Sequence, residues 1–390
     1  PVFCRRAREA PEAEQVLLDG DALAEGRAFL EFGAVTHSPD HAWLAYTVDV
    51  EGAEQFQLVF RNLSTGEELQ TEAQSCAGDL EWANDSHTVF FTERDEELRP
   101  SRVFSATRDG GPLRLVYEEA DPAFFIGVDK TSDHAFILIV AHQSTTSEVR
   151  VIDAARPDSA PRLIAPRERD VEYDVDHWRD TFFIRTNADG AEDFKIVTAP
   201  DGSPGRASWA DWAPAAPGVL RLGFVVFAGH LARLERADAR PRIVITDLAN
   251  QSEHEIAFDE AAYDVRLRPG YEFETATLRF GYSSPSTPSE VYDYDMDTRA
   301  RTLVKRQEIP SGHNPSDYVV ERLDAPAHDG ETIPVTVLRR CETPTDGTAP
   351  LLLYGYGSYG HTIPAGFSSN RLSLVDRGFV YAIAQMLCTR

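Results

Sequence analysis

A serine nucleophile is the first chemistry to look for, because a serine hydrolase holds its reactive serine in a G-x-S-x-G turn, with an acid and a histidine in reach. No serine of the 390 residues fits this pattern. Ser358 has Tyr356 where the first glycine should stand, and Ser203 has Asp201 there. The printed sequence therefore lacks a complete Ser-Asp-His triad.

A glycine-rich turn carries a second set of candidates. It runs from Gly355 to Gly360 and follows the apolar run Pro350–Tyr354. A tyrosine phenol is neutral near pH 7, so it can donate a hydrogen bond without carrying charge. From the residues alone, Tyr354, Tyr356 and Tyr359 are interpreted as aromatic side chains packed around a turn.

Two acidic segments resemble metal sites. The first segment has aspartates at alternate positions, like the start of a calcium loop: Asp293, Asp295 and Asp297. Counted from Asp293, however, its sixth position is not glycine and its twelfth is not glutamate, as that loop requires. The second segment consists of Asp174, Asp176 and His177. No further His or Cys is clustered with them to complete a metal site. Both are interpreted as polar faces or edges of strands, and the sequence predicts no metal.

The composition restricts the function classes. The chain has 38 Lys and Arg against 64 Asp and Glu, a formal charge of −26, and no clustered basic run, which argues against a nucleic-acid binder. No apolar run approaches the ~20 residues of a membrane helix. The four cysteines are far apart, which favours reduced thiols in a cytoplasm.

The elements that would position these residues follow a repeat. A strand-like run, a turn rich in Gly, Pro, Asp, Asn or Ser, and a second strand-like run recur along the chain. The six regular copies are marked by Leu58, Val103, Val149, Phe194, Ile243 and Val291, which are 45, 46, 45, 49 and 48 residues apart. A seventh, looser copy opens the chain with Val2–Cys4, a loop containing Pro11, and Val16–Leu18.

Further β-rich runs precede the hairpins, among them Trp43–Val48, Thr88–Thr92 and Ala135–Ile139. Four strands per ~45 residues are typical of a β-propeller blade, which buries its faces against neighbouring blades. A solenoid or a sandwich could share this strand content. The favoured prediction is a mainly β fold with a seven-bladed β-propeller over residues 1–309, whose first blade is incomplete because its two leading strands are missing.

The pattern changes in residues 310–390. A hairpin with a D-G turn joins Val319–Leu323 to Ile333–Leu338, and Pro350–Tyr354 is predicted to be a buried strand of a parallel sheet. Helical spacing in Ser369–Arg377 and a strand at Phe379–Ala384 follow. Strand, turn, helix and strand are the opening of an α/β fold.

Several of these segments together carry a family resemblance. They are 282–288, 291–296, 350–360 and 371–378. They resemble the oligopeptidase B branch of the prolyl oligopeptidase family of serine peptidases, and the resemblance extends to about Ala384. The segment Tyr354-Gly355-Tyr356-Gly357 is its most specific part.

The resemblance implies a seven-bladed propeller over an α/β-hydrolase domain, of which residues 310–390 would be the incomplete N-terminal part. It implies hydrolysis of short, basic peptides after Arg or Lys through an acyl-enzyme, without metal or organic cofactor. Tyr356 would donate its phenol O–H in the oxyanion hole, and Tyr359 would lie near the substrate. The family carries its triad downstream of the last strand, so this chain alone is expected to be inactive.

The ends of the chain are expected to be truncated relative to the family. The last six residues depart from the family pattern, which suggests a shifted reading frame or an assembly error. A genuine short form is the alternative. Two alternatives remain open from other classes: a non-catalytic propeller that binds a peptide or partner, and a propeller glycosidase with paired carboxylates.

Overall fold

The computed structural model describes residues 1–7, 9–358 and 361–385. It consists mostly of antiparallel sheets and divides into two compact units, which are described separately. The first comprises Pro1–Glu192 and Ile196–Pro214, and the second Asp193–Lys195 and the chain from Ala215 onward. The predicted boundary between residues 309 and 310 stays a prediction.

In its described residues, the first unit contains four sheets of four strands, each with its strands in chain order. The first sheet is β3 (Glu31–His37), β4 (Trp43–Asp49), β5 (Gln57–Asn62) and β6 (Glu68–Gln70). The second is β7 (Cys76–Trp82), β8 (Thr88–Arg94), β9 (Pro100–Thr107) and β10 (Arg114–Glu118). The third is β11 (Phe125–Lys130), β12 (Phe136–His142), β13 (Ser147–Asp153) and β14 (Arg162–Leu163). The fourth is β15 (Tyr173–Trp178), β16 (Thr181–Thr186), β17 (Lys195–Pro200) and β18 (Ala210–Ala213).

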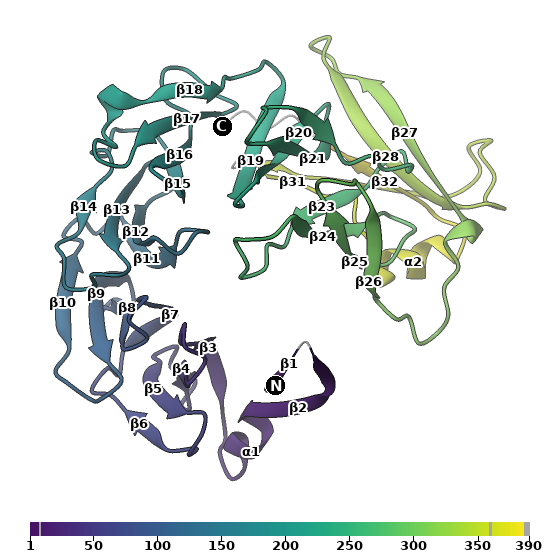
Figure 1. Cartoon of the computed structure of the whole chain (residues 1–390). Helices are drawn as coiled ribbons and strands as arrows, with labels where there is room; N and C mark the ends of the chain where they lie inside the picture. The colour runs from purple at the N-terminus through teal and green to yellow at the C-terminus, as the bar shows by residue number, and fades with distance from the viewer. Residues whose placement is uncertain (8, 359–360, 386–390) are drawn as a thin grey trace. The chain divides into compact units, whose positions relative to one another are not determined.

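The sheets of the first unit follow one another along an arc, with the first strand of each on the inner side (Figure 1). The apolar run of strand β8 is explained by burial of both of its faces. Val89 and Phe91 belong to a core shared with the first sheet, while Phe90 belongs to a core shared with the third. All three are fully buried, so both faces of the second sheet are covered by neighbours.

The chain begins with a smaller, two-stranded sheet. It pairs β1 (Val2–Ala7) with β2 (Ala10–Asp19), and the short helix α1 (Gly20–Ala24) follows. The predicted hairpin is therefore present, but the predicted loop around Pro11 is not, because β2 begins at Ala10. The two strands continue pairing up to Ala7 and Ala10.

The described part of the second unit contains two further four-stranded antiparallel sheets with their strands in chain order. One is β19 (Val219–Val226), β20 (His230–Ala237), β21 (Arg240–Asp247) and β22 (Glu253–Glu255). The other is β23 (Asp264–Leu267), β24 (Thr277–Ser283), β25 (Glu290–Asp295) and β26 (Arg301–Arg306). They share one core, which includes Ile243, Ile245, Leu278 and Phe280. Repeated four-stranded sheets confirm the mainly β prediction and agree with propeller blades.

The last sheet of the second unit has a different topology, with strand order β27–β28–β32–β29. Its strands are β27 (Tyr318–Pro326), β28 (Thr332–Arg340), β29 (Leu351–Gly355) and β32 (Val380–Ala384). Strands β29 and β32 are parallel, and the other pairs are antiparallel. The helix α2 (Ser369–Val375) ends before Gly378, whose φ of +88° suits glycine.

The prediction that β29 is buried is wrong. Leu351 and Leu353 are 60% and 63% exposed, whereas Leu352 between them packs against the core that includes Leu372 and Val375 of α2. Successive side chains of a strand point to opposite faces. The helix therefore covers one face of this outer strand, and the leucines on the other face remain exposed.

Candidate functional site

The segment Tyr354–Ser358 is the predicted chemical site, and the structure places it at the carboxyl end of the parallel pair. Gly355, the last residue of β29, is in register with Ala384 of β32. Tyr356 follows, and β30 (Gly357–Ser358) pairs with β31 (His361–Thr362). Ligands of open α/β sheets bind beyond the carboxyl ends of the strands, so the topology presents Tyr356 at a suitable edge.

The Tyr356 side chain is 41% exposed, and Tyr354 is 44% exposed. Neither is buried in the core, in contrast to the interpretation of packed aromatics that the residues alone suggest. An exposed phenol is free to donate to a ligand, but the oxyanion role remains a prediction. Tyr359 lies outside the described residues, so its predicted place near the substrate stays a prediction too.

Around this sheet, hydrogen bonds and ring contacts hold α2 and the chain that precedes β27. The Tyr318 hydroxyl donates to Asp376 Oδ1 at 2.7 Å, and burial together with this bond raises the pKa of Tyr318 to about 12. The His313 ring stacks on the Tyr318 ring, with centroids 5.2 Å apart. The Phe367 ring contacts the His313 ring edge-on, with centroids 5.1 Å apart. These contacts make His313 part of the packing.

In the structure, carboxylates of the two acidic segments form ion pairs with neighbouring side chains. Asp174 pairs with Arg185 at 2.8 Å, and His177 Nδ1 lies 2.6 Å from Asp133 Oδ2. Asp293 pairs with Arg279 at 2.7 Å. Across the ranges that the structure covers, no group of three His, Cys, Asp or Glu side chains is placed to hold a metal ion.

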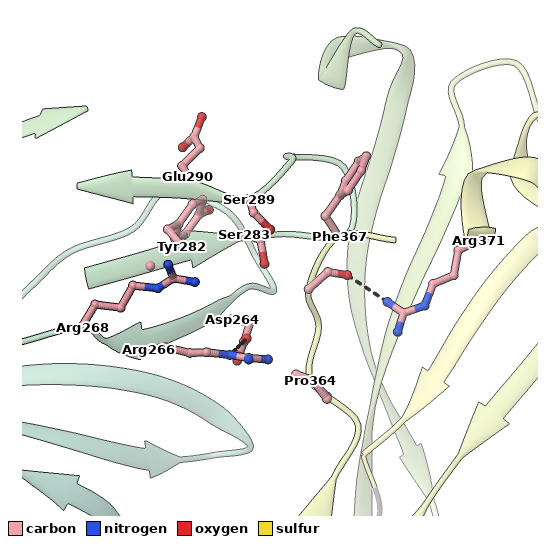
Figure 2. A pocket seen from close by; sticks show the side chains of 12 residues that line it. Asp264, Arg266, Arg268, Tyr282, Ser283, Ser289, Glu290, Pro364, Phe367 and Arg371 are labelled. Carbon is pink, nitrogen blue, oxygen red and sulfur yellow. Dashed lines mark hydrogen bonds and ion pairs between the residues drawn. The ribbon is translucent and has the colours of Figure 1, made fainter. Parts of the chain in front are cut away.

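The sequence did not predict a group of arginines that the fold brings together. Arg266 and Arg268 follow Asp264 in alternation, and with Arg371 they line a cleft of about 200 Å³ beside β23 and β24 (Figure 2). The alternation Asp-x-Arg-x-Arg was visible in the sequence, but only the fold brings Arg371 to the same cleft.

Comparison with known proteins settles the family. The model of the prolyl oligopeptidase N-terminal β-propeller domain matches residues 1–307. The chain belongs to the prolyl oligopeptidase family. Most of the chain is thus the propeller domain of a serine peptidase family.

Individual relatives agree with this assignment. Dipeptidyl aminopeptidase BI of Pseudoxanthomonas mexicana is 41% identical over 377 residues, which cover 96% of this chain and 52% of that protein. Protease 2 of Moraxella lacunata is 27% identical, over 99% of this chain and 56% of that protein. Oligopeptidase B from Leishmania major superposes with a TM-score of 0.89 at 28% identity, over 99% of this chain and 56% of that chain. The chain spans about half the length of the relatives that it matches.

No helix in the described part of the chain has the length and apolar character needed to cross a membrane.

Proposed function

We propose that this chain is part of a serine peptidase that hydrolyses short peptides through an acyl-enzyme. A seven-bladed propeller would restrict access to the active site, and residues 310–390 would begin an α/β-hydrolase domain. Membership of the prolyl oligopeptidase family supports the reaction class. The parallel pair β29–β32, with a glycine turn at its carboxyl end, supports the hydrolase interpretation of the last sheet.

A direct role for this chain in the reaction is supported by Tyr356, whose side chain is exposed at that carboxyl end. In acyl transfer, negative charge develops on the carbonyl oxygen in the transition state. A phenol O–H held beside that oxygen stabilises the charge, and Gly355 and Gly357 on either side permit the close approach of backbone. Tyr356 would therefore share the oxyanion hole with a backbone N–H, while the nucleophile, acid and histidine would come from sequence beyond this chain.

Two specificities are compatible with the relatives. Cleavage after Arg or Lys is favoured by the structural similarity to oligopeptidase B from Leishmania major and from Trypanosoma brucei, with TM-scores of 0.89 and 0.87. Removal of N-terminal dipeptides is favoured by the relative named dipeptidyl aminopeptidase BI, which is 41% identical. We propose cleavage after basic residues as the first candidate and dipeptide removal as the second.

The test uses the protein encoded by the complete gene. One substrate has a blocked N-terminus and Arg before a fluorogenic leaving group, and the other is a dipeptide with a free amine before the same group. Turnover of the blocked substrate supports the first candidate, and turnover of only the free-amine substrate supports the second. Saturable peptide binding without turnover of either would support the non-catalytic propeller instead.

The role of Tyr356 has its own variant. Tyr356→Phe removes one oxyanion donor, so kcat is expected to fall by about 10²–10³ with a smaller change in KM. Tyr354→Phe, two residues earlier on β29, is the matched control and is expected to retain activity. Equal activity of Tyr356→Phe and the wild type would refute the oxyanion role. The 390-residue chain by itself is expected to show no serine-reagent-sensitive turnover.

A further inference from the structure

The arginine-lined cleft lies within the second unit and does not include Tyr356 among its lining residues. One wall is formed by β23, β24 and the start of β25. The other is formed by the loop around Pro364 and Phe367 and by Arg371 of α2. In Figure 2, Arg266 and Arg268 extend from the first wall, and Arg371 extends from the helix on the opposite side.

The first wall presents charges of both signs on one side. Asp264, Arg266 and Arg268 alternate, so their side chains share a face of the extended chain. Asp264 Oδ2 accepts a hydrogen bond from Arg266 Nε at 3.0 Å. Arg268 forms no ion pair or side-chain hydrogen bond with any residue in the described ranges. Its guanidinium is therefore available to a ligand.

Gly281 of β24 makes room for this guanidinium. A Cβ atom at Gly281 would lie only 3.1 Å from Arg268 Nε and 3.8 Å from its Cδ and Cζ. Such a distance is tighter than ordinary van der Waals contact, so the arginine lies directly against the strand backbone. The glycine thereby determines where the Arg268 guanidinium can lie.

Arg371 on the other wall is held by two contacts that leave part of its guanidinium unused. Its Nη1 donates to the Gly366 carbonyl at 2.9 Å, and its Cζ lies 5.4 Å from the centroid of the Tyr381 ring. A guanidinium has five N–H donors, and the carbonyl takes one. No carboxylate among the described residues lies within ion-pair distance of Arg371.

The carboxylates of the cleft are already neutralised. Asp264 is paired with Arg266. Glu290 accepts from Arg306 Nε at 2.6 Å and from the Tyr292 hydroxyl at 2.6 Å. Burial and the Glu290 bond raise the pKa of Tyr292 to about 12, so this phenol stays a donor at neutral pH. Among the described residues that line the cleft, Arg268 and Arg371 therefore have no carboxylate partner, although the chain as a whole has a formal charge of −26.

We propose that this cleft binds an oxyanion, a carboxylate or a phosphate group, through Arg268 and Arg371. The planar guanidinium fork matches the oxygens of both groups, and the Ser283 and Ser289 side chains in the lining add hydroxyl donors. The cleft of about 200 Å³ is smaller than the ~300 Å³ at which pockets for drug-sized ligands begin. It therefore suits a free anion or the carboxyl end of a peptide.

The experiment is calorimetric titration of the 390-residue chain with three probes: inorganic phosphate, N-acetyl-glycylglycine and the C-terminal amide of that dipeptide. Saturable binding of phosphate alone would identify a phosphate site. Binding of the free dipeptide acid but not of its amide would identify a site for peptide carboxyl ends. Absence of saturable binding by any probe, or equal binding of the acid and the amide without phosphate binding, overturns the proposal.

Variants locate the binding in the cleft. Arg268→Gln is expected to weaken binding about tenfold or more, because a hydrogen bond to a charged group contributes about 1.5–3 kcal/mol. Gly281→Ala keeps the net charge but moves the guanidinium, so it should weaken binding too. Arg377→Gln removes the same charge from the exposed residue that follows α2, where the side chain donates to the Ser373 carbonyl, and should not change binding. An equal loss in Arg268→Gln and Arg377→Gln would show a diffuse charge effect and refute the site.

Discussion

Replacement of Glu81 by glutamine is expected to stabilise the folded chain at alkaline pH. Glu81 lies half-buried on β7, with Asp79 on the same strand and Asp129 on β11. Burial and the charges of Asp129 and Asp79 raise its pKa to about 7, against the opposing effect of Lys130. The carboxylate is thus held where its ionised form is disfavoured.

The magnitude follows from the linkage between protonation and folding. Each tenfold change in an acid dissociation constant corresponds to about 1.4 kcal/mol. A pKa raised from 4.5 to about 7 therefore gives folding a contribution on the order of 3 kcal/mol that is present below pH 4.5 and is lost as the pH rises through 7. Glutamine has no proton to lose, so this pH dependence should disappear from the variant.

The assay is urea unfolding of the wild type and Glu81→Gln at intervals from pH 4.5 to pH 9. The difference in the free energy of unfolding should shift in favour of the variant by roughly 1–3 kcal/mol between pH 4.5 and pH 8. The control is Glu97→Gln, which changes an exposed glutamate in the loop after β8 and should show no such shift. A stability difference that does not vary with pH would refute the reasoning.

Two further predictions concern packing. Arg167 Nη2 lies 2.5 Å from Glu119 Oε2 and 3.2 Å from Glu148 Oε1. Arg167→Leu should lower the free energy of unfolding by about 3 kcal/mol, because the two buried carboxylates would lose the cation that they share. A urea midpoint equal to that of the wild type would contradict this. Leu353→Lys should increase the soluble yield of the 390-residue chain, because it places a charge on an exposed outer strand, whereas Leu352→Lys on the packed face should reduce it. Equal yields of the two lysine variants would show that exposure of β29 does not limit solubility.

Local sequence predicted the strands well, because the blade strands are defined by short-range signals. The run Val89-Phe90-Phe91 has no polar alternation, and this is what a strand buried on both faces requires. Gly378 correctly marks the end of α2. Such signals depend on neighbours along the chain, so they remain visible without any knowledge of the tertiary structure.

Burial and charge environment could not be predicted in the same way. Leu351 and Leu353 belong to an apolar run that suggests a core strand, but their exposure depends on the position of β29 at the outside of the described sheet. The Arg268 and Arg371 side chains are more than 100 residues apart, and only the packing of the loop around Phe367 against β24 brings them to one cleft. Tyr356 was found from family resemblance, and its exposure follows from the turn after β29.

The strand order of the last sheet imposes an order of assembly during synthesis. β29 leaves the ribosome before β32, yet in the described sheet its one neighbour is β32, which separates it from the β27–β28 hairpin. The hairpin can close as soon as it emerges, but β29 has to wait for about 25 more residues before it finds its partner. During that interval β29 has no strand partner, and β32 then inserts between the β27–β28 hairpin and β29 once both have been synthesised.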